Sequence, residues 1–224
     1  NKSFISSSQK TNSKISLGFF SKSGGFSHKN FYSLNCSYNS GDKKNLVKKN
    51  ILYAQTNLFL DKKKIKFVNQ THSSKTIIVD KHNYIHKHVA DGIITQDKDI
   101  CIAILTADCC PIFLYDEDNK FISCLHAGWK GVYFNIIKNA ANQITKIQPN
   151  VKKINAIIGP CLNKKNFEVS DDFRENFIKI NPKYKDYFNK NIIINKFFFD
   201  MRNLIKSELI ENKITNIEDI DIDT

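Results

Sequence analysis

Short runs of β-branched and aromatic residues recur along this chain of 224 residues, and they restrict its fold more than any other feature. Residues of this kind favour β-strands. Several runs are apolar throughout, which is typical of strands covered on both faces. The pattern predicts strands at ISLGFF (15–20), IKFVNQ (65–70), KTIIVD (75–80), DGIITQ (91–96), CIAIL (101–105), PIFLYD (111–116), KFISCL (120–125) and INAIIG (154–159).

Helical periodicity appears in four other segments. An apolar residue recurs at every fourth position in 131–147, and 43–58 carries a similar apolar face. Ser170 and Asp200 are N-cap candidates at the start of two further amphipathic segments. Sheets with a few amphipathic helices, without strict strand–helix alternation, predict an α+β fold.

The length and composition indicate one globular domain with a sizeable core. Residues 15–224 contain no repeat or low-complexity linker, and residues 1–14, rich in Ser, Asn and Lys, are expected to form a mobile arm. No apolar run approaches the ~20 residues that span a bilayer. The polar start of the chain lacks the apolar region of a signal peptide. We therefore expect a cytoplasmic protein with no membrane partner.

The net charge of +12 raises the possibility of a basic RNA-binding module. Arg174 and Arg202 are the only arginines, so the excess is almost entirely lysine. Arginine makes the bidentate phosphate and guanine contacts that nucleic-acid readout uses. Its scarcity argues against specific nucleic-acid binding and favours a solvated lysine-rich surface.

The six cysteines do not indicate a disulfide framework in a cytoplasmic chain of this length. Cys101 and Cys124 lie in apolar runs and are expected to be small core residues. The sequence contains neither CxxC nor zinc-finger spacing. Any metal site must therefore be assembled from distant segments.

Three predicted strands end in residues of the metal-ligand type. His72 ends FVNQTH, Cys109 ends AILTADC, and His126 lies just before a glycine turn in CLHAGWKG. Two imidazoles and a thiolate suit zinc and leave a fourth position for water or substrate. From spacing alone, the histidines could equally be satisfied or exposed residues, and Cys109 a core residue or a nucleophile. Asp108 is a candidate proton carrier or histidine-orienting group, or the cap of a turn.

Five segments resemble the YfiH family, also called the laccase-domain or polyphenol-oxidase-like family, in order along the chain. They are NQTHSSKTIIV, ADGIITQD, LTADCCPIFLYD, CLHAGWKG and IGPCLNKKNFEV. An N-terminal block, GFFSKSGGFS, is similar too, and the resemblance extends from about Leu17 to the end. The combination of TADC with HAGWKG is the most specific part.

The resemblance implies a zinc site made by His72, Cys109 and His126, and an α-β-β-α layered fold similar to a bacterial toxin's deamidase domain. It also implies phosphorolysis of adenosine, inosine and S-methyl-5′-thioadenosine, with deamination of adenosine. Lys22 and Lys130 are the candidates for binding phosphate, at positions where the family commonly has arginine. Family members continue into an aromatic, arginine-containing tail, so a short tail is expected to be missing after Thr224.

Three alternative functions differ in class from a zinc-dependent phosphorylase. A copper-dependent polyphenol oxidase, or laccase, needs more histidines than the six present, and the single methionine, Met201, lies in a predicted helix. A cysteine hydrolase would use Cys109 as the nucleophile with a histidine base. A basic RNA-binding module would bind in a salt-sensitive way that does not depend on His72.

Overall fold

The computed structural model describes residues 4–5, 15–116, 118, 120–191 and 196–224. The chain forms two compact units. The first is built from the chain up to Ile65 together with Asp99–Cys101, and the second from Lys66–Lys98 and Ile102–Thr224. Most of the predicted arm, 1–14, lies outside the described residues. No described helix is long and apolar enough to cross a membrane.

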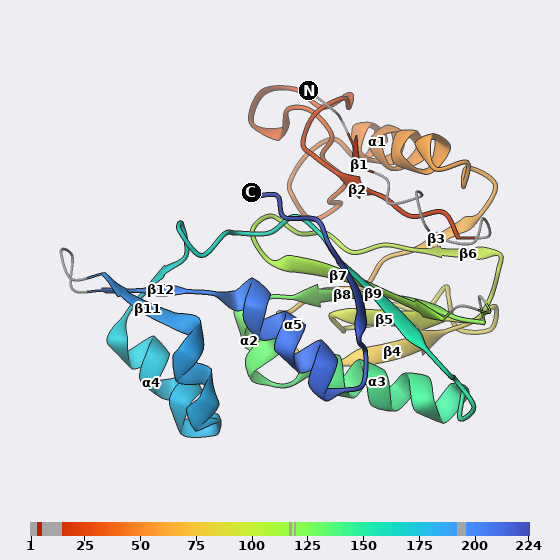
Figure 1. Ribbon diagram of the computed structural model, residues 1–224. Helices are drawn as coiled ribbons and strands as arrows, with labels where there is room; N and C mark the ends of the chain where they lie inside the picture. Colours follow the sequence, from red (N-terminus) through yellow and green to blue (C-terminus); the bar gives the residue numbers. More distant parts are fainter. Residues whose placement is uncertain (1–3, 6–14, 117, 119, 192–195) are drawn as a thin grey trace. The chain divides into compact units, whose positions relative to one another are not determined.

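The first unit contains one long helix and a short hairpin-like sheet (Figure 1). Its described elements are β1 (Phe4–Ile5), β2 (Phe19–Phe20), the 3₁₀ turn η1 (Lys29–Phe31) and α1 (Lys44–Asn57). β1 and β2 pair in antiparallel fashion. The helix predicted over 43–58 is confirmed, whereas the strand predicted over 15–20 is reduced to its last two residues.

The second unit is built on a six-stranded mixed sheet with the strand order β13-β9-β7-β8-β5-β4. Its strands are β4 (Thr76–Val79), β5 (Gly92–Thr95), β7 (Cys110–Asp116), β8 (Ile122–Ala127), β9 (Ile154–Ile158) and β13 (Asn216–Asp219). The outer pairs β13–β9 and β4–β5 are parallel, and the central neighbours are antiparallel. β3 (Lys64–Lys66) and β6 (Ile100–Ile102) form a separate two-stranded sheet where the chain passes between the units.

β7 and β8 follow one another along the chain and pair in antiparallel fashion. Asp116, at the end of β7, accepts the backbone N–H groups of Lys120 and Phe121 at 2.6 and 3.2 Å. This carboxylate closes the turn and fixes the antiparallel register that runs from Cys110–Ala127 to Tyr115–Ile122.

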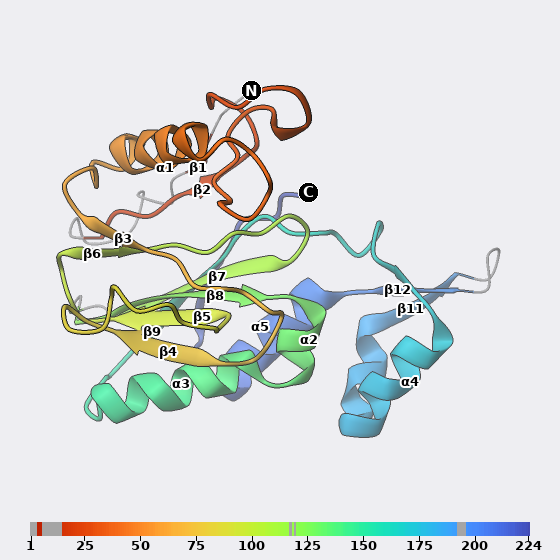
Figure 2. The ribbon, with the colours of Figure 1, turned by 180° about the vertical axis from the view of Figure 1, so that it is seen from behind.

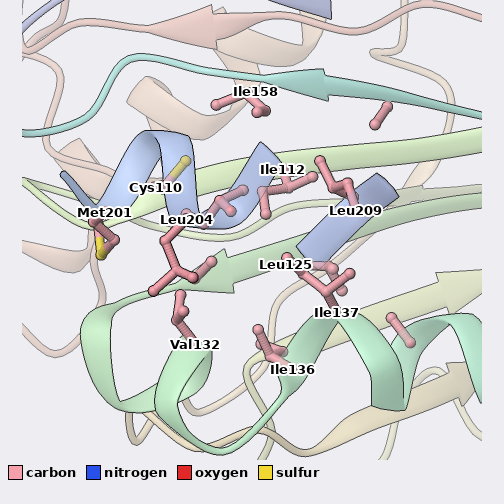
Figure 3. Packing of buried hydrophobic residues seen from close by; sticks show 14 of the residues in the cluster. Cys110, Ile112, Leu125, Val132, Ile136, Ile137, Ile158, Met201, Leu204 and Leu209 are labelled. Carbon is pink, nitrogen blue, oxygen red and sulfur yellow. The ribbon is translucent and has the colours of Figure 1, made fainter. Parts of the chain in front are cut away.

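Two helices cover one face of the large sheet, as both ribbon views show (Figures 1 and 2). They are α3 (Ile136–Ile147) and α5 (Met201–Glu211). Figure 3 shows Cys110, Ile112 and Leu125 of the sheet directed toward Leu204 and other apolar side chains of these helices. All four are fully buried, so this layer is the hydrophobic core.

The helix predicted over 131–147 is two helices. α2 (Trp129–Tyr133) ends at Phe134, and α3 begins after Asn135, whose backbone is left-handed with φ 63°. Asparagine adopts this conformation more readily than most residues, and a left-handed residue cannot continue a right-handed helix. The predicted apolar positions remain buried on both sides of the break.

A smaller part of the second unit is held together by aromatic rings. It contains β10 (Glu168–Val169), α4 (Asp171–Ile180), the 3₁₀ segment η2 (Pro182–Tyr187), β11 (Phe188–Asn191) and β12 (Lys196–Phe199). Phe177 of α4 is fully buried, and its ring lies 5.0 Å from that of Phe199 and 5.8 Å from that of Phe188. Ser170 accepts the backbone N–H of Phe173, so the predicted N-cap of α4 is confirmed.

Candidate metal centre

His126 lies near the end of β8, between two neighbouring strands. Pro111 of β7 is its partner on one side, and its backbone N–H donates to Asp91 O, just before β5, on the other. Leu125 and Ala127 belong to the helix-covered core. Because successive side chains of a strand point to opposite faces, His126 is directed away from that core. Its side chain is nevertheless almost fully buried.

Cys109 and Cys110 separate at the start of β7. Cys110 is the first residue of the strand and is completely buried in the core. Cys109 precedes the strand, is half-buried, and is directed to the side where His126 lies. The two neighbouring thiols therefore occupy different environments.

His72 lies in the loop between β3 and β4, and its backbone is left-handed with φ 58°. A non-glycine residue in this region is strained and persists where its surroundings hold it. Here the loop is held on both sides of His72. Asp91 accepts the backbone N–H of His72 at 3.0 Å, and Asn139 of α3 donates to Ser74 O at 3.1 Å.

The three side chains converge although they come from separate segments. The ligand atoms of His72, Cys109 and His126 all lie within 4.8 Å of one another. The imidazole rings of the two histidines lie 4.8 Å apart, edge to face. Tetrahedral ligands of zinc lie about 3.5 Å from one another, so the three donors are near the spacing that zinc requires.

Gly128 leaves the space that this cluster occupies. A Cβ atom at this position would lie 2.8 Å from Cys109 Sγ and 3.2 Å from His72 Cδ2. The backbone of Gly128 is extended, with φ −73°, so its conformation alone does not require glycine. The absence of a side chain is needed because the two donor residues pack directly against the backbone. The donor set and this packing both fit a metal ion.

Asp91 is the carboxylate of the site, and the sequence pattern did not single it out. It is completely buried, yet its oxygens accept from the ring Nδ1 of His126 at 2.8 Å and from the Ser73 hydroxyl at 2.6 Å. Burial by itself would raise the pKa of Asp91, but the hydrogen bonds from His126 and Ser73 outweigh it and hold the pKa well below its ordinary value. Asp91 is therefore an anion.

The surroundings of His126 are electrostatically negative. Burial alone would lower the pKa of His126, but the hydrogen bonds with Asp91 and Cys109 outweigh it and raise the pKa to about 9. Groups that stabilise a positive charge on this ring also attract a metal cation, which competes with the proton for the same side of the imidazole. The site is thus suited to a cation.

The other predicted site residues lie at different places. Asp108 is exposed and accepts from the hydroxyl of Thr224 at 3.3 Å, so the carboxylate that contacts a histidine of the cluster is Asp91. Lys130, exposed in the first turn of α2, has its ammonium 5.4 Å from the centre of the Trp129 ring. Lys22 lies in the first unit, where its carbonyl accepts two backbone N–H groups. The functional roles of these three residues stay predictions.

The remaining histidines are outside the cluster. Among the described residues, the only group of three or more His, Cys, Asp or Glu with converging ligand atoms is His72, Cys109 and His126. His86 and His88 lie with ring centres 6.2 Å apart, in the loop that also holds the exposed His82. The three histidines of HNYIHKH, which are close in sequence, therefore do not form a second cluster of this kind among the described residues.

Comparison with known proteins identifies the family. The family model described as multi-copper polyphenol oxidoreductase laccase matches residues 16–224. The chain belongs to this family. Its members include the YfiH proteins that the sequence motifs resemble, and the five segments quoted above all lie inside the matched region.

Two named relatives are similar to this chain in sequence, and two solved structures share its fold. Purine nucleoside phosphorylase RC0672 of Rickettsia conorii is 32% identical over 80% of this chain and 77% of its own length. Purine nucleoside phosphorylase YlmD of Bacillus subtilis is 32% identical over 71% of this chain and 61% of its own length. The Neisseria meningitidis protein NMB0706 superposes with a TM-score of 0.85 over 99% of this chain and 88% of its own, at 23% identity. The Bacillus licheniformis YfiH structure gives a TM-score of 0.81 over 92% and 81%, at 24% identity.

Proposed function

We propose that this chain is a zinc-dependent purine nucleoside phosphorylase that also deaminates adenosine. The observation that carries the proposal is the convergence of His72, Cys109 and His126, whose ligand atoms lie within 4.8 Å of one another. Relatives that are 32% identical bear the name purine nucleoside phosphorylase, which supports the reaction class. The proposed substrates are adenosine, inosine and S-methyl-5′-thioadenosine, each with phosphate.

The metal would be held by the two imidazoles and the thiolate. Zinc bound in such a set supplies Lewis-acid activation of water, which is the chemistry that deamination of a purine needs. The described residues contain one cluster of this kind, made of a single cysteine and two histidines, and this supports zinc over copper. A multicopper oxidase requires several copper sites, each with its own set of ligands.

The protein groups around the cluster have separate tasks in phosphorolysis. In this reaction a phosphate oxygen attacks the anomeric carbon while the bond to the purine breaks, and the departing base takes up a proton. Lys130 is exposed, two residues after Gly128, and would hold phosphate by its charge. Asp108, exposed and one residue from Cys109, would carry the proton. Lys22 is the second residue that we propose binds phosphate.

The decisive experiment measures products from adenosine and phosphate. Zinc-loaded protein should release adenine and ribose-1-phosphate in a phosphate-dependent reaction, and inosine in a phosphate-independent one. Both should disappear on chelation or in Cys109→Ala, because each removes the metal. Zinc-loaded protein that forms neither adenine nor inosine would refute the proposed function.

The role of Lys130 is tested with a matched pair of variants. Lys130→Met should raise the KM for phosphate roughly 10-fold or more, because a charge-assisted contact to phosphate is lost. Lys138→Met removes an equally exposed lysine from α3 and should leave this KM unchanged. An equal change in both variants would mean that only the net charge matters.

One observation favours a second candidate function, that of a cysteine hydrolase. The Cys109 thiol lies within 4.8 Å of the His126 ring nitrogen and interacts with it electrostatically, and His126 is hydrogen-bonded in turn to Asp91. A thiol, an imidazole and a carboxylate in this order make up the activated nucleophile of many hydrolases. Metal-free protein that is active and is inactivated by iodoacetamide at Cys109 would support the hydrolase. Inactivity without zinc would support the phosphorylase.

A further inference from the structure

Asp91 connects two of the three proposed ligands through its two carboxylate oxygens. It lies directly before β5, whose first residue, Gly92, pairs with Leu125 of β8. This register places Asp91 beside His126, and the side chain lies beneath the loop that carries His72. The carboxylate is fully buried, so water does not share its hydrogen bonds.

The first oxygen fixes the chemical form of His126. Asp91 Oδ1 lies 2.8 Å from His126 Nδ1. An ionised carboxylate can only accept hydrogen bonds, so Nδ1 must carry the proton. Nε2 is then the nitrogen whose lone pair binds a metal once the metal has displaced the proton there. The same oxygen accepts the backbone N–H of His72 at 3.0 Å, so it contacts both histidine residues.

The second oxygen fixes the path of the His72 loop. Asp91 Oδ2 accepts the backbone N–H groups of Thr71 and Ser73 at 3.2 and 2.7 Å, and the Ser73 hydroxyl at 2.6 Å. With His72, three consecutive N–H groups therefore converge on one carboxylate. This convergence is possible only because the His72 backbone is left-handed, with φ 58°. Successive N–H groups that wrap around an anion in this way form a backbone nest.

We propose that Asp91 is the positioning residue of the metal centre, which sets the tautomer of His126 and the backbone of His72 together. Asp91 does not contact the metal. It acts through both histidines, so its removal loosens two ligands with one substitution. The inference rests on the proposed metal site and adds the group that organises it before the metal binds.

Asp91→Asn is the sharpest test because it keeps the shape and removes one acceptor. An amide NH₂ in place of Oδ1 would face His126 Nδ1 and force the proton onto Nε2. An NH₂ in place of Oδ2 would face the N–H donors of Thr71 and Ser73. Either orientation of the amide therefore disrupts one set of contacts, with His126 Nδ1 in the first case and with the backbone of Thr71 and Ser73 in the second. The affinity for zinc should fall about 10- to 100-fold, the usual effect of losing a partner that orients a metal ligand.

Asp116→Asn is the matched control. Asp116 is also buried and also accepts two backbone N–H groups, but it lies at the opposite end of β7 from Cys110. Zinc affinity is measured by competition with a chromophoric chelator, and Co²⁺ substitution reports the ligand geometry through its visible spectrum. Asp116→Asn should lower the melting temperature and leave zinc affinity and the Co²⁺ spectrum as they are in the wild type.

The outcomes separate the inference from the proposed function. Wild-type protein that does not bind zinc would refute the metal site itself. Wild-type affinity in folded Asp91→Asn, or an equal loss in Asp116→Asn, would overturn the role of Asp91 and leave the metal site standing. If Asp91→Asn does not fold, Ser73→Ala decides, because it removes one donor to Oδ2 and keeps the contact with His126. A several-fold loss of zinc affinity in Ser73→Ala supports the inference, and unchanged affinity overturns it.

Discussion

Gly128→Ala tests whether the cluster needs the space next to its backbone. The added methyl carbon would lie 2.8 Å from Cys109 Sγ and 3.2 Å from His72 Cδ2. Ordinary contacts between such atoms are about 3.5–4.0 Å, so the sulfur or the backbone must move by about 1 Å. A functional group has to stay within about 0.5 Å of its productive position. Overpacking of this kind costs about 1–3 kcal/mol. A bound metal holds Cys109 and His72 where the methyl group meets them, whereas the metal-free protein can move them aside. The cost therefore falls on the metal-bound state and lowers the zinc affinity by up to roughly 5- to 100-fold at ~1.4 kcal/mol per factor of ten.

Gly131→Ala provides the control on the same helix. A Cβ at Gly131 would lie no closer than 3.3 Å to Ser73 O and would make no contact with Cys109. Alanine is also the better helix former inside α2. Chelator competition should give wild-type zinc affinity for Gly131→Ala and weaker binding for Gly128→Ala, with both variants folded by circular dichroism. Equal affinity in the two variants would refute the steric reasoning, and the site would then need another explanation for glycine.

Two further predictions concern the core. Burial raises the pKa of Glu208 from 4.5 to about 7, and the nearby Glu211 adds to this against the hydrogen bond from Tyr184. Between pH 4.5 and about 7 the folded state therefore keeps a proton on Glu208 that the unfolded state has lost. The free energy of unfolding falls by roughly 3 kcal/mol as the pH rises through this range. Glutamine does not titrate, so the free energy of unfolding of Glu208→Gln, measured with urea, should rise relative to that of the wild type by this amount across the same pH range. A difference between the two that does not change with pH would contradict the prediction. Cys110→Ala should cost about 1 kcal/mol in unfolding free energy and keep one zinc per chain by elemental analysis, whereas Cys109→Ala should lose the zinc.

Five strands of the large sheet were predictable because each lies in a short, mostly apolar run. β4, β5, β7, β8 and β9 all fall on predicted runs, within two residues at each end. The grouping of His72, Cys109 and His126 could also be anticipated, because each follows or ends such a run. Their role as zinc ligands stays a prediction, as do the roles of Asp108 and the two lysines.

The sequence was less informative where contacts join distant segments. β13 pairs in parallel with β9, and β10 and β11 both pair with β12. Of these five strands only β9 was predicted, and the four short strands β10, β11, β12 and β13 were not. Short strands of this kind are stabilised by their partners, and a local pattern does not identify the partner. Asp91 was missed for the same reason. An Asp before an apolar run is common, and only the register between β5 and β8 places it beside His126.

The left-handed His72 explains why the buried carboxylate is needed. A non-glycine residue in this conformation costs about 1–3 kcal/mol. Hydrogen bonds to a charged group contribute about 1.5–3 kcal/mol each, and Asp91 accepts three from consecutive backbone N–H groups of the loop. These values are already net of the hydrogen bonds to water that the groups give up, so three such bonds exceed the strain of one residue. The geometry of the His72 loop is therefore fixed by the protein itself, and a metal would bind to donors that already face one another.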